Sequence, residues 1–433
     1  MLGIDSMAAF EVRDLPGRGR GCVAVRDLKV GETLLHEEPL VAMQTATADG
    51  VSPSACAVCL RLLKPITVQL RAILLAAGKD DACLDTMADD DDAATPPEHC
   101  SRCQLSFCCS RCRLSGWHGV QCSRSSDVPD ALKAVVSACD ASHAADLANV
   151  ATMYCRTMCS IVAASVKEEE EEEEEAVTTS LHPGALPHHP EGNLLALLRH
   201  LDDSGPLPAC CEPPNIEQGP QPPHSPPPPL FPLGRATALP QEPQEHTLPL
   251  TPLLEPLLLS LARLEGGEVL SPPGGGATDV LTVQSFRWFA KVLQTNAQRV
   301  RVPSTVVPFL VSSMQRGTNE VVCREVMAAL HAVLPSPGAF DALALHGKAL
   351  FLRYAMLNHS CAPSASVFSP KVAECASVTV AVGGEGGPIQ AGAEITINYI
   401  RDQPGELTIE QRKLLLSKSW GFQCTCFVCE GCI

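Results

Sequence analysis

Closely spaced cysteine pairs constrain the fold of this chain more than any other sequence feature. The chain has 22 cysteines in 433 residues. A first cluster holds four pairs of candidate ligands: Cys56 and Cys59, Cys100 and Cys103, Cys108 and Cys112, and His118 and Cys122. One loop turn can present two thiolates to a tetrahedral zinc ion. Eight such ligands predict two zinc sites in residues 56–122, with Cys109 as an alternative to Cys108.

A second cluster lies near the end of the sequence, where Cys424, Cys426 and Cys429 follow one another closely. Three ligands leave a tetrahedral zinc ion one short. We expect Cys361 to be the fourth, with Cys432 as its competitor. Such a site would hold the tail against residues near Cys361, and its binding energy would become local folding energy.

The start of the sequence and its hydropathy favour a cytoplasmic or nuclear protein. Residues 1–10 lack a basic start followed by a long apolar run, so no signal peptide is expected. No window of 18 uninterrupted apolar residues predicts a membrane span. In that setting, abundant cysteines indicate thiolate metal sites rather than disulfides.

The net charge says little about partners. Of the formal charge of −17, twelve charges lie in two acidic runs, 89–92 and 168–175. We expect both runs to be solvated. Arginines near the first cluster form no clear stripe, so a zinc-dependent nucleic-acid binder is a minor hypothesis.

Hydrophobic periodicity predicts an α+β chain. Strands are expected in 11–42, around the glycine-rich loop 17–21, and again at 378–382 and 394–399. Helices are expected at 68–77, 128–165, 253–264, 280–293, 320–333 and 411–419. Seventeen prolines between 206 and 256 predict a linker of polyproline character. Residues 60–99, between two ligand pairs, are expected to loop out at small entropic cost.

The segment 357–363 is the most informative motif in the second half of the chain. It contains Asn358, His359, Ser360 and Cys361, four consecutive residues that can donate, accept or bind metal. About forty residues later, an alternating strand ends in Tyr399. At the end of a strand, a tyrosine hydroxyl can interact electrostatically with a partial charge that develops on a reacting group, without forming a covalent bond to it.

The order of these motifs resembles the SET-MYND protein-lysine methyltransferases. The resemblance covers about 11–42, 56–122, 282–300 and 347–430, including Phe107, Trp117 and the run Trp420 to Cys429. It implies a SET β-fold of short sheets with a pseudo-knot, an inserted MYND zinc finger, a helical insert and a cysteine-rich post-SET tail. The implied divisions are 8–48 (SET, first part), 56–122 (finger, with insert 60–99), 128–165 (helical), 166–256 (acidic and proline-rich disordered linker), 257–346 (helical insert), 347–403 (SET core) and 404–433 (zinc tail).

The resemblance also implies a cofactor, S-adenosylmethionine, and a protein substrate with a target lysine. Tyr399 matches the catalytic tyrosine, which also lines the cofactor site. The other implied cofactor contacts are Arg18, Gly19, Arg20, Asn296, Asn358, His359 and Phe422. The implied zinc sets interleave: Cys56, Cys59, Cys108 and Cys112; Cys100, Cys103, His118 and Cys122; and Cys361, Cys424, Cys426 and Cys429. Three zinc ions are therefore expected.

Two departures from the family pattern affect the lysine channel. Ala297 stands where many members have a phenylalanine, and Trp420 where some have a second tyrosine. The Ala297 change and the long inserts motivate an alternative: a catalytically weak SET-MYND scaffold that recruits partners, such as proline-rich peptides, through its finger. We expect a monomer that does not bind membranes.

Overall fold

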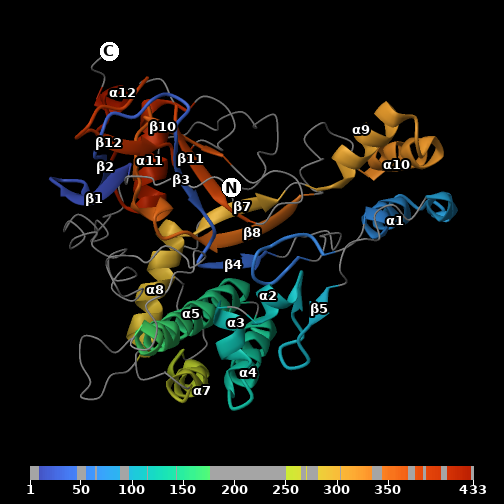
Figure 1. The fold of residues 1–433 in the computed structure, drawn as a ribbon, viewed down its shortest axis with the longest axis horizontal. Helices are drawn as coiled ribbons and strands as arrows, with labels where there is room; N and C mark the ends of the chain where they lie inside the picture. Colours follow the sequence, from blue (N-terminus) through green and yellow to red (C-terminus); the bar gives the residue numbers. More distant parts are fainter. Residues whose placement is uncertain are drawn as a thin grey trace, which may run out of the picture.

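Short sheets and a layer of helices make up separate parts of the molecule (Figure 1). The structure is a computed structural model. It describes residues 9–45, 55–63, 66–87, 97–114, 116–142, 144–175, 250–264, 270, 281–302, 304–333, 344–368, 376–383, 387–400 and 407–430. The α+β class predicted from the sequence is confirmed at this level.

Four sheets are present in the described residues, and the first contains strands from the glycine-rich region and from the segment 357–363. Its strand order is β1-β2-β12-β9. The other three have the orders β10-β11-β3, β4-β8-β7 and β5-β6. The strands are β1 (Phe10–Leu15), β2 (Gly19–Ala24), β3 (Thr33–Glu37), β4 (Val41–Gln44), β5 (Glu98–His99), β6 (Ser106–Phe107), β7 (Gln298–Val302), β8 (Leu345–Leu350), β9 (Asn358–His359), β10 (Ala365–Phe368), β11 (Val378–Val382) and β12 (Glu394–Ile397).

In the first sheet, β12 lies between two segments that are distant in the sequence. It pairs antiparallel with β2, Ile395 opposite Cys22, and parallel with β9, Ile397 opposite His359. The glycine-rich loop expected at 17–21 is a tight hairpin between β1 and β2, closed by the amide of Arg18 donating to the carbonyl of Leu15 (3.0 Å). This order carries the hairpin and β9 to opposite edges of β12.

The helices divide between a main layer, a projecting unit and the tail. The main layer contains α2 (Ser110–Leu114), α3 (Gly116–Gln121), α4 (Val128–Ala141), α5 (Ala145–Glu175), α7 (Leu250–Ala262) and α8 (Val283–Asn296). The projecting unit contains α1 (Ile66–Ala76), α9 (Val306–Arg316) and α10 (Glu320–Val333), and the tail contains α11 (Ile409–Trp420) and α12 (Phe427–Glu430). Two 3₁₀ turns are η1 (Ala82–Thr86) and η5 (Tyr354–Met356).

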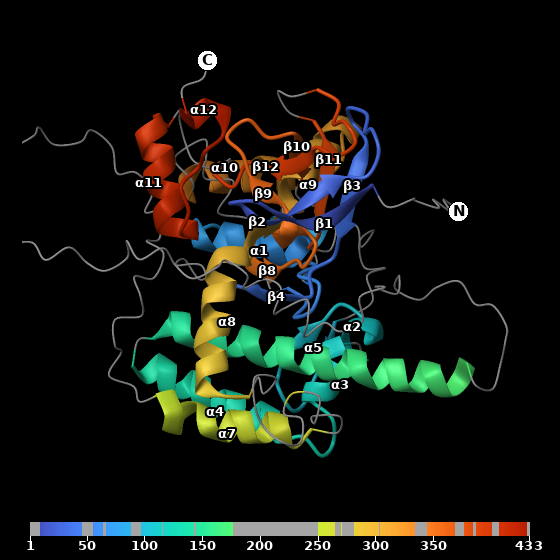
Figure 2. The ribbon, with the colours of Figure 1, turned by 90° about the vertical axis from the view of Figure 1, so that its left-hand side faces the viewer.

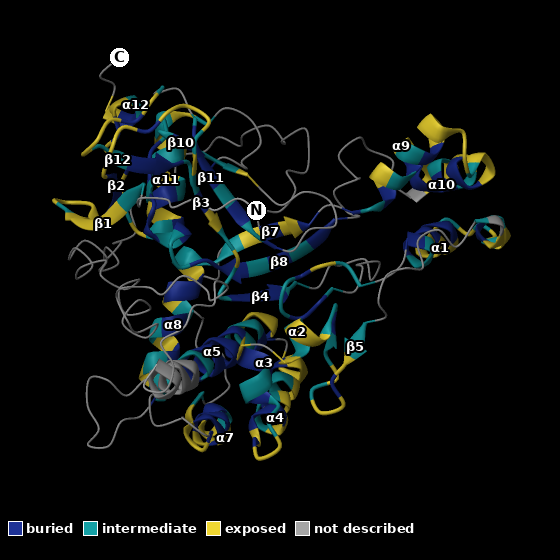
Figure 3. Ribbon diagram, in the orientation of Figure 1, coloured by how far each residue is buried: buried dark blue, intermediate teal, exposed yellow. Residues whose placement is uncertain are grey.

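Helix α5 crosses the main layer and contributes much of its core (Figures 2 and 3). The ring of Tyr154 meets those of Phe286 and Phe289 on α8 edge to face, with centroids 5.3 and 5.4 Å away. Such aromatic pairs contribute beyond the area they bury. Of the described helices, none is long and apolar enough to cross a membrane.

The linker predicted at 166–256 differs from the structure at both ends. Helix α5 continues through Glu175, so the backbone of the acidic run is helical, and α7 begins at Leu250. The first turns of α5 pack against the rest of the protein, and this packing stabilises the helix, which then continues beyond the part that packs. Residues 176–249, which hold most of the predicted linker, lie outside the described residues.

The insert between Cys59 and Cys100 does not simply loop out. Its helix α1 packs with α9 and α10 in a separate apolar core, which includes Leu70, Leu310 and Val326. Lys79 also pairs with Glu325 on α10 (2.9 Å). Two inserts that are more than 200 residues apart in the sequence therefore form one projecting unit (Figure 1).

Arg156 on α5 joins the cysteine-rich segment to the sheets. Its side chain is 5% exposed and its guanidinium lies 4.4 Å from the centre of the Trp117 ring. One nitrogen donates to the carbonyls of Ala42 on β4 (2.6 Å) and Ala57 (3.3 Å). A buried cation needs such partners, and burial lowers the pKa of Arg156 to about 10, which leaves it charged at neutral pH.

Candidate metal centres and candidate active site

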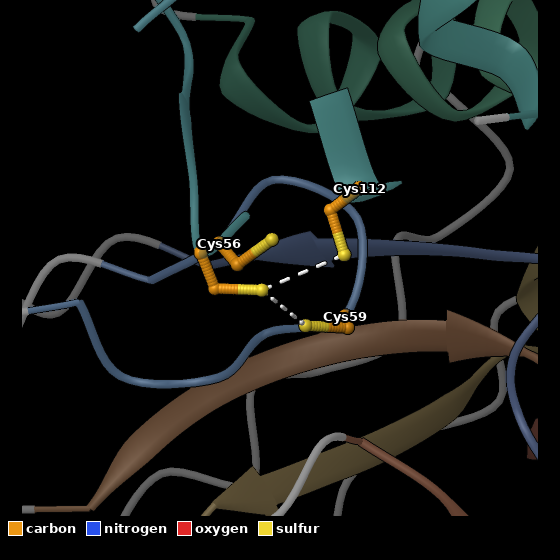
Figure 4. Close-up of side chains that lie close together, drawn as sticks. Cys56, Cys59 and Cys112 are labelled. Carbon is orange, nitrogen blue, oxygen red and sulfur yellow. Dashed lines mark hydrogen bonds between the residues drawn. The ribbon is translucent and has the colours of Figure 1, made fainter. Parts of the chain in front are cut away.

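The first candidate metal centre contains Cys56, Cys59, Cys108 and Cys112. Cys56 and Cys59 lie in one turn, while Cys112 is on α2, and their sulfurs converge (Figure 4). The Sγ atom of Cys108 lies 3.6 Å from that of Cys59 and 3.5 Å from that of Cys112. Cys109 lies beside this centre, its Sγ 3.7 Å from that of Cys108, and is not one of the four grouped ligands.

The second centre contains Cys100, Cys103, His118 and Cys122. The Nε2 atom of His118 lies 3.4 Å from the Sγ of Cys103, and its Nδ1 contacts the carbonyl of Arg113. Because a carbonyl only accepts, Nδ1 carries the proton and Nε2 presents its lone pair to the sulfurs. A backbone partner of this kind orients many metal-binding histidines.

The third centre contains Cys361, Cys424, Cys426 and Cys429. Cys361 follows β9, and its Sγ lies 3.5 Å from that of Cys429. The tail between α11 and α12 therefore lies against the segment 357–363. Cys432, the competing ligand, lies outside the described residues.

All three groups fit a tetrahedral zinc ion. In each, the four candidate ligand atoms lie within 4.8 Å of one another. A zinc ion with Zn–S bonds of about 2.3 Å separates its sulfur ligands by about 3.8 Å. The donor sets, Cys₄, Cys₃His and Cys₄, are those of structural zinc sites. Three centres that could hold zinc are therefore present, with the predicted ligand sets.

Tyr399 lies just after β12, among three other aromatic side chains. Ring centroids lie 5.3 Å away for His359, 5.3 Å for Trp420 and 6.3 Å for Phe422. The Tyr399 hydroxyl donates to the carbonyl of Leu357 (2.6 Å). Burial raises the pKa of Tyr399 well above its ordinary value, so the side chain is a neutral phenol at physiological pH.

His359 contacts both Tyr399 and the third metal centre. The Tyr399 amide donates to its Nδ1 (3.1 Å), and its Nε2 lies 3.4 Å from the Sγ of Cys361. Burial and the nearby charge of Arg18 lower the pKa of His359 to about 4. Both ring nitrogens of His359 therefore have protein partners.

Asn358 and Arg18 meet at a carboxylate that the sequence did not single out, Glu394. The Nδ2 atom of Asn358 donates to Glu394 Oε1 (2.9 Å) and to the carbonyls of Arg20 (3.0 Å) and Arg18 (3.5 Å). Arg18 pairs with Glu394 (3.3 Å) and donates to the carbonyl of His359 (2.9 Å). These contacts orient the Asn358 amide, with its nitrogen toward the protein.

Asn296 is at the end of α8 and is connected to this site through its neighbour. Its Nδ2 donates to Val292 and Thr295, within its own helix. The carbonyl of Thr295 accepts a hydrogen bond from the indole of Trp420 (3.1 Å). Trp420 therefore connects the end of α8 to the ring of Tyr399.

Two carboxylates that contact the candidate site, Glu394 and Glu37, were not predicted from the sequence. Glu394 begins the strand that leads to Tyr399, and that position was the available signal. Glu37 accepts from the amides of Arg353 (3.0 Å) and Tyr354 (2.9 Å) and so holds η5, which precedes Leu357. The partners of Glu37 are more than 300 residues away, and no local pattern indicates them.

Gly21 is packed closely against three side chains of the site. A Cβ there would lie 2.6 Å from Leu15 Cδ1, 2.7 Å from Asn358 Nδ2 and 3.0 Å from Glu394 Oε1. We expect Gly21→Ala to displace the Asn358–Glu394 pair and to lower the free energy of unfolding by about 1–3 kcal/mol. Chemical denaturation measures this loss.

Gly383→Ala is the matched control for Gly21→Ala. Its Cβ would meet only the Oγ of Ser366, at an ordinary 3.7 Å. We expect a change below about 0.5 kcal/mol there. Equal stabilities for the two variants would contradict the close packing at Gly21.

Comparison with known proteins leaves this site to be interpreted from its own residues. No family model matches the chain, and no curated protein matches it either.

Proposed function

We propose that this chain is an S-adenosylmethionine-dependent protein-lysine N-methyltransferase with a SET fold, a MYND finger and a post-SET zinc tail. One observation carries the proposal: segments around residues 18–21, 295–296, 357–361, 394–399 and 420–429 are linked to one another by contacts around Tyr399. These are the segments that the family resemblance assigns to cofactor binding and catalysis. The three centres that could hold zinc agree with the same reading.

The residues near Asn358 fit the amino-acid end of the proposed cofactor. The amide nitrogen of Asn358 donates to three protein oxygens, while its Oδ1 accepts no hydrogen bond from the described residues. A half-buried amide oxygen of this kind can accept a hydrogen bond from an ammonium group. The Phe422 ring, 6.0 Å from that of His359, would offer a stacking surface for the adenine.

The aromatic residues around Tyr399 fit the acceptor side of the reaction. The cofactor, when bound, supplies an electrophilic methyl group on a sulfonium. The Tyr399 hydroxyl donates a hydrogen bond to the Leu357 carbonyl, so its oxygen lone pairs face away from that bond and can accept from a lysine amine. Positive charge moves from sulfur to nitrogen, so no oxyanion forms and alignment is the main task.

The substrate class follows from this chemistry. A lysine side chain is long and apolar up to its amine, and the rings of Tyr399 and Trp420 suit such a stem. The target would be a histone or another protein in the cytoplasm or nucleus. The finger formed by the first two centres would offer a site for a proline-rich peptide partner.

Cofactor binding tests the proposal, with Phe422 as the variable. We expect titration calorimetry to show that the zinc-loaded chain binds S-adenosylmethionine, and that Phe422→Ala weakens binding about tenfold, because loss of ring stacking costs about 1–1.5 kcal/mol. Phe427, which is 54% exposed on the same tail, provides the matched control. Phe427→Ala should bind as the unaltered chain does.

Two results would contradict the proposal. One is no heat of binding at millimolar cofactor by a chain that retains its zinc. The other is equal weakening by both phenylalanine variants, which would place the adenine elsewhere.

A further inference from the structure

The imidazole of His359 connects the third metal centre to the residue proposed as catalytic. The side chain is 3% exposed, at the end of β9. Its Nδ1 lies 3.1 Å from the amide nitrogen of Tyr399 and its Nε2 lies 3.4 Å from the Sγ of Cys361. The rings of Tyr399 and Phe422 lie next to it, with centroids 5.3 and 6.0 Å away.

The hydrogen-bond partners determine the tautomer. A backbone amide can only donate, so the Nδ1 of His359 accepts from Tyr399. In the neutral ring the proton is then on Nε2, which points to the sulfur of Cys361. A metal-bound thiolate is a good acceptor, and hydrogen bonds to ligands commonly tune metal sites.

The surrounding chain fixes the ring at this position. The parallel pairing of β9 with β12 sets Ile397 opposite His359, and the amide of Ser360 donates to the carbonyl of Ile397 (2.9 Å). Arg18 donates to the carbonyl of His359. The ring therefore cannot turn without breaking both of its hydrogen bonds.

We infer that His359 is a positioning residue that couples metal binding in the tail to the main chain of Tyr399. Its Nε2–H stabilises the Cys361 thiolate, and its Nδ1 holds the Tyr399 amide, so each contact orients the ring for the other. The catalytic meaning of this coupling rests on the proposed function. The coupling itself depends only on the contacts of His359.

Two substitutions separate the two contacts. In His359→Asn, the amide oxygen can replace Nδ1 and accept from Tyr399, but the shorter side chain does not reach Cys361. In His359→Gln, the amide nitrogen can replace Nε2 and donate to Cys361, but no acceptor stands at the Nδ1 position. His36→Asn is the control, since His36 is exposed on β3, outside the three metal groups, and its Nδ1 contacts Thr379 Oγ1 (2.9 Å).

Two measurements on the zinc-loaded full chain report separately on the two contacts of His359. Transfer of zinc to a chromophoric chelator gives the rate at which each centre releases its ion. The kinetic phase that disappears in Cys426→Ser is the phase of the tail centre. Amide hydrogen exchange of the peptide containing Tyr399 reports its backbone bond. We expect His359→Asn to accelerate tail-zinc release 10- to 100-fold with the other two phases unchanged, and with exchange at Tyr399 close to that of the unaltered chain.

For His359→Gln we expect the opposite pattern: tail-zinc release within about threefold, and exchange at Tyr399 about five- to tenfold faster. Equal effects of both variants on both readouts, or no effect of either, would overturn the inference and leave His359 a packing residue. Neither readout needs methyl transfer. An inactive chain with the expected pattern would reject the proposed function and keep the coupling.

Discussion

Replacing Tyr399 by phenylalanine is expected to reduce the rate of methyl transfer about 100-fold or more, with little change in cofactor affinity. The Tyr399 hydroxyl lies among aromatic side chains, and its hydrogen bond to the carbonyl of Leu357 sets its direction. Removing one oriented polar group from an active site costs about 100- to 1,000-fold in rate. Steady-state kinetics give the rate and calorimetry gives the affinity.

Tyr154→Phe is the matched control, because it also removes a buried hydroxyl. Tyr154 packs against Phe286 and Phe289 in the helical layer, away from the Tyr399 site. We expect it to lower stability by about 1 kcal/mol and to leave the transfer rate unchanged. A Tyr399→Phe rate within threefold of the unaltered rate would remove Tyr399 from the chemistry.

Replacing Cys361 by serine is expected to lower the zinc content from three ions per chain to two and to abolish transfer. The other three ligands of this centre come from the tail, so loss of Cys361 removes the cross-link between the tail and the segment 357–363. Metal binding at such a centre is folding energy for that part of the chain. The tail also carries Phe422 and Trp420, so we expect both cofactor affinity and transfer to fall.

Metal analysis by mass spectrometry and the transfer assay are run on the same preparation. Cys83→Ser serves as control, because Cys83 lies outside the three groups; this variant should retain three zinc ions and full activity. Retention of three ions by Cys361→Ser would show that another residue is the fourth ligand.

The metal centres could be predicted because ligand spacing is a local property. Pairs such as Cys56 and Cys59 belong to single turns, and the structure groups all twelve predicted ligands as expected. The choice of Cys361 depended on counting: three tail cysteines need a fourth partner. The choice between Cys108 and Cys109 needed coordinates, since both follow the same short strand.

The rest depended on contacts between distant residues. Helix α1 was predicted, but its packing on α9 and α10 was not, because no local pattern shows that two inserts share a core. The pairing of β9 with β12 involves two residues of each strand, too few for any periodicity. The sequence indicated Glu394 only as the start of a strand. Its contacts are with Asn358 and Arg18, which lie 36 and 376 positions away along the chain.

Label transfer to lysine tests the central claim most directly. The zinc-loaded chain would be incubated with S-adenosylmethionine labelled in its methyl group and with a histone mixture or a cell lysate, and labelled peptides would be sequenced by mass spectrometry. We expect label on lysine side-chain nitrogen, lost in Tyr399→Phe and retained in Tyr154→Phe. Absence of label on lysine, from a chain that holds its three zinc ions, would contradict that claim.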